Sequence, residues 1–106
     1  MNNPLRIGFI GGGFITRFHI QSLVQVRDCV VAGVADMSMD AAESAAALAQ
    51  SIGVGPEARA FESAEAIAAD PKVDALWVCA PNHARIQVLE GIRDGAVNRA
   101  EPLKGI

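Results

Sequence analysis

A glycine triplet, Gly11-Gly12-Gly13, is the feature of this sequence that most constrains its fold. The run before it, Leu5 to Ile10, is short and almost wholly apolar, as in a buried strand. After it, from Phe14 to about Val26, apolar residues recur at helical spacing. A strand that enters a helix through consecutive glycines predicts a tight turn between a sheet and a helix that covers it.

The same alternation continues along the chain. Short apolar runs lie at residues 29–35, 58–61, 73–80 and 103–106, and helix-like segments at 39–52, 63–69 and 83–94. Apolar strands that alternate with helices predict a parallel sheet covered on both faces. Because such crossovers are right-handed, we expect an α/β fold, a doubly wound parallel sheet with strand order 3-2-1-4-5. The fifth strand would begin at Leu103, and the chain ends at Ile106, within it.

Composition indicates one small globular domain. The chain has 106 residues, 51% hydrophobic and 20% charged, with a net charge of −3. These values argue against a disordered chain and against a nucleic-acid-binding surface. No apolar run reaches the ~20 residues of a membrane span. Cys29 and Cys79 lie far apart and predict two reduced thiols.

Two further expectations concern location and assembly. The first residues show no export signal, so we expect a cytoplasmic protein. The mean hydropathy of +0.27 is high for so small a domain and indicates apolar surface that a partner covers. We therefore expect a homo-oligomer.

The glycines match the first two positions of the dinucleotide fingerprint G-x-G-x-x-G/A, with Thr16 at the third. Asp36 ends the second apolar run 20 residues later, at the spacing the fingerprint predicts. Gly11 allows the turn, and Gly13 lets the backbone approach a pyrophosphate at the free N–H groups of the helix. Asp36 can accept hydrogen bonds from both ribose hydroxyls and would repel a 2′-phosphate, which favours NAD over NADP. The β-branched Thr16 should push helix and strand slightly apart.

A second candidate segment follows the fourth strand. In doubly wound sheets, ligands bind beyond the carboxyl ends of the strands, where the strand order reverses. Residues 11–15 and 80–83 should therefore line one crevice. Asn82 is also suited to cap the helix that follows it. No carboxylate or nucleophile is spaced to pair with His19 or His83, so we expect neither to be catalytic.

Three segments, residues 6–19, 33–36 and 75–83, resemble the glucose–fructose oxidoreductase / inositol dehydrogenase / MocA (GFO/IDH/MocA) family. The resemblance implies a Rossmann-like domain of an NAD(P)-dependent oxidoreductase that transfers hydride to or from a sugar, polyol or related hydroxy compound. It also implies cofactor-binding residues. The pyrophosphate would be held by Gly11, Gly13, Phe14 and Ile15, the adenosine ribose by Asp36, and the nicotinamide side by Ala80, Pro81, Asn82 and His83.

The sequence also departs from the family. Thr16 replaces the usual Gly or Ala, and Arg85 stands where a second histidine is common. The family's Glu-Lys-Pro motif, whose lysine lies near the reacting carbon, is absent because Glu101-Pro102 lacks the lysine and is interpreted as a loop. We therefore expect residues 1–106 to be an incomplete dinucleotide-binding domain, inactive alone, without catalytic residues or metal and lacking the substrate domain.

Two alternatives stay open from the sequence. One is a non-catalytic nucleotide-binding or sensing module. The other is a similar fold that binds a different adenosine ligand, such as S-adenosylmethionine.

Overall fold

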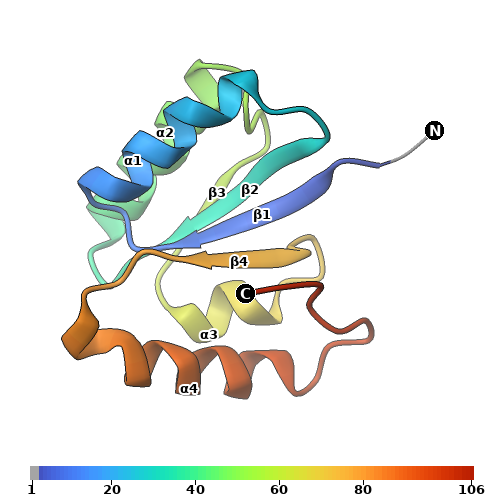
Figure 1. Cartoon of the computed structure of the whole chain (residues 1–106). Helices are drawn as coiled ribbons and strands as arrows, with labels where there is room; N and C mark the ends of the chain where they lie inside the picture. Colours follow the sequence, from blue (N-terminus) through green and yellow to red (C-terminus); the bar gives the residue numbers. More distant parts are fainter. Residues whose placement is uncertain (1–2) are drawn as a thin grey trace.

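A computed structural model describes residues 3–106 and builds them around a parallel sheet (Figure 1). Its strands are β1 (Leu5–Ile10), β2 (Cys29–Ala35), β3 (Arg59–Phe61) and β4 (Ala75–Val78). They pair in parallel in the order β3-β2-β1-β4. The parallel sheet and the predicted order of its first four strands are confirmed.

Helices cover both faces of this sheet. They are α1 (Phe14–Ser22), α2 (Met39–Ser51), α3 (Ala64–Ala69) and α4 (Arg85–Ala96). A 3-10 turn, Leu23–Gln25, continues α1, and another, Asn82–Ala84, precedes α4. As Figure 1 shows, α1 and α2 lie on one face and α3 and α4 on the other, so the sheet is doubly wound. No helix within residues 3–106 is long and apolar enough to cross a membrane.

Each face of the sheet has its own hydrophobic core. The core under α1 and α2 contains the fully buried Phe9, Ile20 and Val34. The core on the α3 and α4 face contains Ile67 and Leu76. Burying side chains of this size contributes about 1.5–3 kcal/mol each, so the apolar strands are stabilised from both sides.

The inner face of α2 consists of alanines. Ala42, Ala45 and Ala49 are fully buried, and their small side chains let the helix pack closely on the sheet. Ser38 caps this helix, because its side-chain oxygen accepts a hydrogen bond from the Ala41 N–H. The close packing places the first turn of α2 against the glycine turn after β1.

Residues 103–106, where the sequence predicts the beginning of a fifth strand, make a single bridge to the sheet. Gly105 makes one parallel bridge with Ala75, and its carbonyl accepts a hydrogen bond of 3.0 Å from the Leu76 N–H. The segment thus lies beside β4, where the order 3-2-1-4-5 puts the fifth strand, but it forms no ladder. Leu103 is half-buried and Ile106 is exposed, so little apolar burial is gained by extending the pairing.

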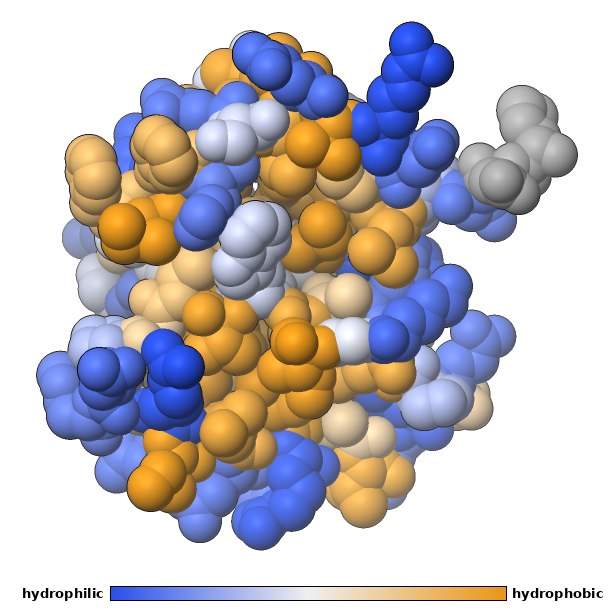
Figure 2. Space-filling view, in the orientation of Figure 1, coloured by the Kyte–Doolittle hydropathy of each residue, from blue (hydrophilic) through white to orange (hydrophobic). Residues whose placement is uncertain are grey.

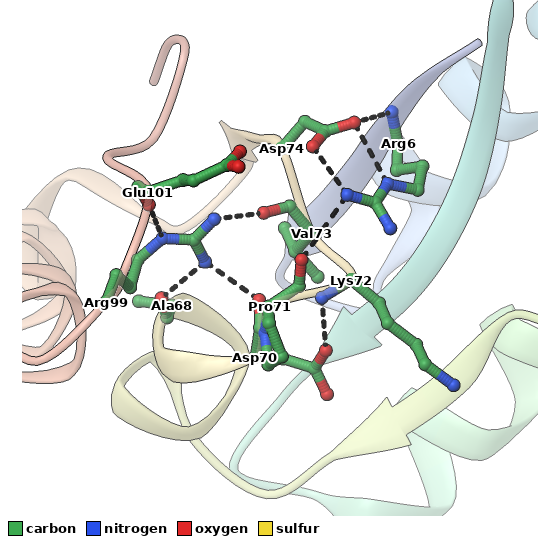
Figure 3. Close-up of polar contacts among 9 residues, drawn as sticks. All are labelled: Arg6, Ala68, Asp70, Pro71, Lys72, Val73, Asp74, Arg99 and Glu101. Atoms are coloured by element: carbon green, nitrogen blue, oxygen red, sulfur yellow. Dashed lines mark hydrogen bonds and ion pairs between the residues drawn. The ribbon is translucent and has the colours of Figure 1, made fainter. Parts of the chain in front are cut away.

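Arg99 holds the loop after α4 against the end of α3 (Figure 3). Its guanidinium donates to the carbonyls of Ala68, Asp70 and Val73 at 3.0, 2.7 and 2.7 Å. Its Nε donates to the Glu101 carbonyl at 2.9 Å. The interpretation of Glu101-Pro102 as a loop is confirmed.

Candidate nucleotide-binding site

The turn between β1 and α1 requires glycine at two positions for steric reasons. Gly11 has a φ of +108°, and a Cβ there would lie 3.0 Å from the Cys79 carbonyl oxygen. A Cβ on Gly12 would lie 2.8 Å from the Ala41 carbonyl oxygen in the first turn of α2. Both glycines are therefore needed by the fold itself, with or without a ligand.

Gly13 differs from its two neighbours. Its φ of −85° is open to any residue, and a Cβ there would meet no atom within 4 Å. It precedes α1, which has no side-chain cap. The Arg17 N–H bonds back to the Gly13 carbonyl at 3.1 Å, and the earlier N–H groups of a helix have no partner within it. Open space beside such donors fits the close approach of a pyrophosphate.

Asp36 lies at the end of β2 with both carboxylate oxygens facing backbone donors. Oδ2 accepts a hydrogen bond of 2.7 Å from the Gly12 N–H, and Oδ1 accepts one of 2.8 Å from the Ser38 N–H. A carboxylate has about four lone-pair sites, so roughly two stay free for hydroxyl donors. Asp36 is half-buried, which leaves it accessible to a ribose.

The segment after β4 adjoins the glycine turn. The Cys79 N–H donates to the Ile10 carbonyl at 2.8 Å, and the ideal Cβ position of Gly11 lies 3.7 Å from the Ala80 nitrogen. Ala80 is half-buried, whereas Pro81, Asn82 and His83 are exposed. The start of the segment thus lies at the same carboxyl edge as the glycine turn.

The capping role predicted for Asn82 is wrong. The chain enters a 3-10 turn after Pro81, closed by a 3.0 Å hydrogen bond from the Ala84 N–H to the Pro81 carbonyl. The cap position of α4 itself is Ala84, and neither helical segment has a side-chain cap. Because Asn82 is within the turn and not before it, its side chain is not positioned to cap.

The first turn of α1 places its side chains in two environments. Phe14 is 80% exposed and Ile15 is 54% exposed, so what these residues offer at the glycine turn is their backbone N–H groups. Thr16 is buried, and its Oγ1 has no hydrogen-bond partner within residues 3–106. The third fingerprint position therefore holds a hydroxyl that burial leaves unpaired.

His19 packs against the sheet. Its ring lies 4.3 Å from that of Trp77 on β4, and Trp77 in turn stacks on Phe9 at 5.2 Å. This aromatic stack is a packing role that sequence spacing does not reveal, since it joins α1 to two strands. Cys29 and Cys79 are both free and half-buried.

A separate hollow lies at the opposite, amino ends of the strands. It is lined by Arg6, Arg59, Asp70 and Asp74, among others. Both arginines are paired, Arg6 with Asp74 and Arg59 with Asp70, so their charges are neutralised within the protein. Over residues 3–106 there is no group of three or more His, Cys, Asp or Glu that could hold a metal. The carboxyl edge is therefore the stronger candidate site.

Comparison with known proteins agrees with this geometry. Residues 5–93 match the family model GFO_IDH_MocA, described as "Oxidoreductase family, NAD-binding Rossmann fold". Myo-inositol dehydrogenase from Lactobacillus casei, solved with NAD(H) and myo-inositol, is 25% identical with a TM-score of 0.72, and the match covers 91% of this chain. UDP-N-acetylglucosamine 3-dehydrogenase from Acidithiobacillus ferrooxidans is 31% identical with a TM-score of 0.66, over 92% of this chain.

A super-repressor mutant of Gal80p from Saccharomyces cerevisiae, 17% identical with a TM-score of 0.75, shares the fold over 92% of this chain. The chain spans 26%, 28% and 25% of the lengths of these three structures. No curated protein matches the chain. The family match covers most of the sequence, and the chain belongs to the GFO/IDH/MocA oxidoreductases as an NAD-binding Rossmann domain.

Proposed function

We propose that the chain binds NAD across the carboxyl edge of its sheet, with the pyrophosphate at the first turn of α1. The observation that carries this proposal is the contrast among the three glycines. At Gly11 and Gly12, neighbouring backbone atoms leave no room for a side chain. Gly13 faces open space at the start of α1, which has no side-chain cap. A glycine that the fold does not need is explained by a ligand that needs the room. In this proposal Gly11 and Gly13 shape the site, and the N–H groups of Phe14 and Ile15 bind the pyrophosphate.

The remaining contacts follow from the same placement. Asp36 accepts hydrogen bonds from the adenosine ribose with the lone pairs that Gly12 and Ser38 leave free. Its negative charge disfavours a 2′-phosphate, so we propose NAD over NADP as the cofactor. Residues Ala80, Pro81, Asn82 and His83 border the nicotinamide side of the bound cofactor.

For the whole protein we propose hydride transfer between the nicotinamide and a hydroxyl or carbonyl carbon of a sugar-like compound. The bound cofactor supplies the hydride chemistry, and this chain contributes binding and orientation. Support comes from the Lactobacillus casei relative, whose structure holds NAD(H) and myo-inositol. We propose that residues 1–106 are an incomplete dinucleotide-binding domain, that substrate-binding and catalytic residues belong to a further domain, and that the chain alone is inactive. A cytoplasmic location stays a prediction.

We also propose that the chain self-associates through the edge of β4, which residues 103–106 bridge only at Gly105. An apolar groove lies there, and Trp77, Leu89 and Ile106 contribute to it while 37%, 46% and 68% exposed. Figure 2 shows apolar residues gathered on this face of the molecule. Light scattering should give a mass above that of the monomer, and Leu89→Glu should shift it toward the monomer. A monomeric wild-type chain would count against this proposal.

Calorimetry of the chain with NAD, NADP and S-adenosylmethionine tests the binding proposal. We expect NAD to bind at least about tenfold more tightly than NADP, because Asp36 accepts from a hydroxyl and repels a phosphate. S-adenosylmethionine has no pyrophosphate and should bind more weakly than NAD. Equal affinities for NAD and NADP would overturn the cofactor preference, and tighter binding of S-adenosylmethionine would overturn the site assignment.

A further inference from the structure

We infer that Asp36 is also a positioning residue for the pyrophosphate site, because it holds the Gly12 backbone amide in place. This inference rests on the proposed function and adds a second role for a residue whose first role is ribose recognition. Its basis is the 2.7 Å hydrogen bond from the Gly12 N–H to Asp36 Oδ2, which links the end of β2 to the middle of the glycine turn.

The glycine turn has few other attachments at this point. The Gly11 N–H donates to the Ala35 carbonyl at 2.7 Å, which fixes the first glycine to β2. Gly12 is buried and lies against the Ala41 carbonyl, a contact that blocks movement toward α2 but cannot hold the turn in place. Gly13 has open space where a Cβ would lie, and its carbonyl accepts the Arg17 N–H bond that begins α1. The bond to Asp36 is therefore the last fixed point before the N–H groups that would meet the pyrophosphate.

The two roles of Asp36 are compatible in hydrogen-bonding capacity. Gly12 and Ser38 use one lone pair on each carboxylate oxygen. Since a carboxylate accepts about four hydrogen bonds, the ribose hydroxyls and the two backbone amides can be bound together. The adenosine and pyrophosphate subsites then share one carboxylate.

This sharing has a consequence for cofactor preference. Replacing Asp36 with a small neutral residue removes the repulsion of a 2′-phosphate, and it also releases Gly12. Such a change should weaken the binding of every dinucleotide, whether or not its adenosine ribose carries hydroxyls. Conversion to NADP use by this single substitution should therefore fail to give NADP the affinity that the wild type has for NAD.

The test is a cycle of two proteins and two ligands, measured by calorimetry. Wild type and Asp36→Ala are each titrated with NAD and with its analogue that lacks the 2′- and 3′-hydroxyls of the adenosine ribose. If Asp36 only recognises the hydroxyls, the variant and the wild type bind the analogue equally. If Asp36 also positions Gly12, the variant binds the analogue about tenfold more weakly, the effect of losing one charge-assisted hydrogen bond.

Asp40→Ala is the matched control, because it removes a negative charge from the exposed first turn of α2, close in sequence to Asp36. We expect its affinity for the analogue to lie within about twofold of wild type, since surface charges contribute little. A readout that needs no ligand is the Gly12 amide proton, which should lose its downfield NMR shift in Asp36→Ala and keep it in Asp40→Ala. Equal binding of the analogue by wild type and Asp36→Ala overturns the inference while NAD binding stands. Failure of the wild type to bind NAD overturns the proposed function and this inference with it.

Discussion

Asp74 accepts three hydrogen bonds from Arg6, which join the start of β1 to the residue before β4 (Figure 3). The Arg6 backbone N–H and Nε reach Oδ2 at 2.9 and 3.0 Å, and Nη2 reaches Oδ1 at 2.9 Å. Hydrogen bonding to the Arg6 side chain holds the pKa of Asp74 at about 2, below the ordinary 3.8, although burial acts in the opposite direction. The ionised carboxylate therefore stabilises the folded state.

The sign of the pH dependence follows from this lowered pKa. The stabilisation is fully present above the ordinary pKa of 3.8 and is lost as the pH falls from there toward 2. Asp74→Asn should lower the free energy of unfolding at pH 7 by about 1–2 kcal/mol, a value reduced because Arg6 is partly exposed. Urea denaturation should show the difference between wild type and variant shrinking between pH 4 and pH 2. A difference that is constant over this range would contradict the prediction.

Arg99 should contribute more to the free energy of unfolding than Arg93, an arginine on the surface of α4. Arg99→Ala removes the guanidinium donor from the carbonyls of Ala68, Asp70 and Val73, of which Asp70 keeps its bond from the Val73 N–H. We expect a loss of about 1–3 kcal/mol in the free energy of unfolding. Arg93 pairs with Asp94 on the surface at 3.1 Å, so Arg93→Ala should cost less than about 0.5 kcal/mol. Urea denaturation at neutral pH compares the two. Equal losses would show that the carbonyl contacts of Arg99 are not stabilising.

The bounds of a strand were predictable where the apolar run covers the same residues as the hydrogen-bonded pairing with the next strand. Residues 5–10 and 29–35 form β1 and β2 with the predicted bounds, because a strand buried on both faces is a continuous apolar run. The predicted run 73–80 pairs only over Ala75–Val78. Val73 lies outside the strand but is buried in the core. The apolar run is therefore longer than the strand, because core residues next to a strand are apolar as well.

The site was predictable in its glycines and its acid but not in how they are joined. The fingerprint treats Gly12 as a variable position, yet Gly12 bonds to Asp36 and lies against the Ala41 carbonyl. The first contact joins the turn to the end of β2 and the second joins it to the first turn of α2, so both depend on tertiary placement that no local pattern encodes. The contacts of Arg99 are likewise long-range, since its carbonyl partners at residues 68–73 precede it by a whole helix.

Thr16 offers a stabilising substitution. Its Oγ1 is buried and has no partner in the described part of the chain, so folding loses the hydroxyl's hydrogen bonds to water without replacement. Thr16→Val keeps the branched shape and removes the hydroxyl. We expect a gain of about 1 kcal/mol, which raises the melting temperature by about 4–8 °C in a domain of this size.

Thr16→Ala is the comparison that separates polarity from packing. It removes both the hydroxyl and a methyl group, so any gain from the first should be offset by lost packing. Calorimetric melting of the three proteins gives the order. A melting temperature of Thr16→Val below that of wild type would show that the hydroxyl has a partner in solution, such as a bound water molecule.

Alanine substitutions at Gly12 and Gly13 should separate the needs of the fold from those of the cofactor. Gly12→Ala puts a methyl group 2.8 Å from the Ala41 carbonyl oxygen, so we expect a loss of about 1–3 kcal/mol in the free energy of unfolding. Gly13→Ala meets no atom and needs no unusual φ, but Gly13 is the N-cap residue of α1, where alanine is less favourable than glycine. We therefore expect a loss of at most about 1 kcal/mol in the free energy of unfolding.

The affinity for NAD should be more sensitive than stability to the substitution at Gly13. The methyl group of Gly13→Ala occupies the space through which a pyrophosphate approaches the helix start. We expect it to weaken NAD binding at least about tenfold while the free energy of unfolding falls by at most about 1 kcal/mol. Urea denaturation and calorimetric titration on the same protein sample measure the two effects together. If Gly13→Ala bound NAD as tightly as wild type, the pyrophosphate would not lie against Gly13. The open space at this glycine would then need another explanation, because the fold alone does not require it.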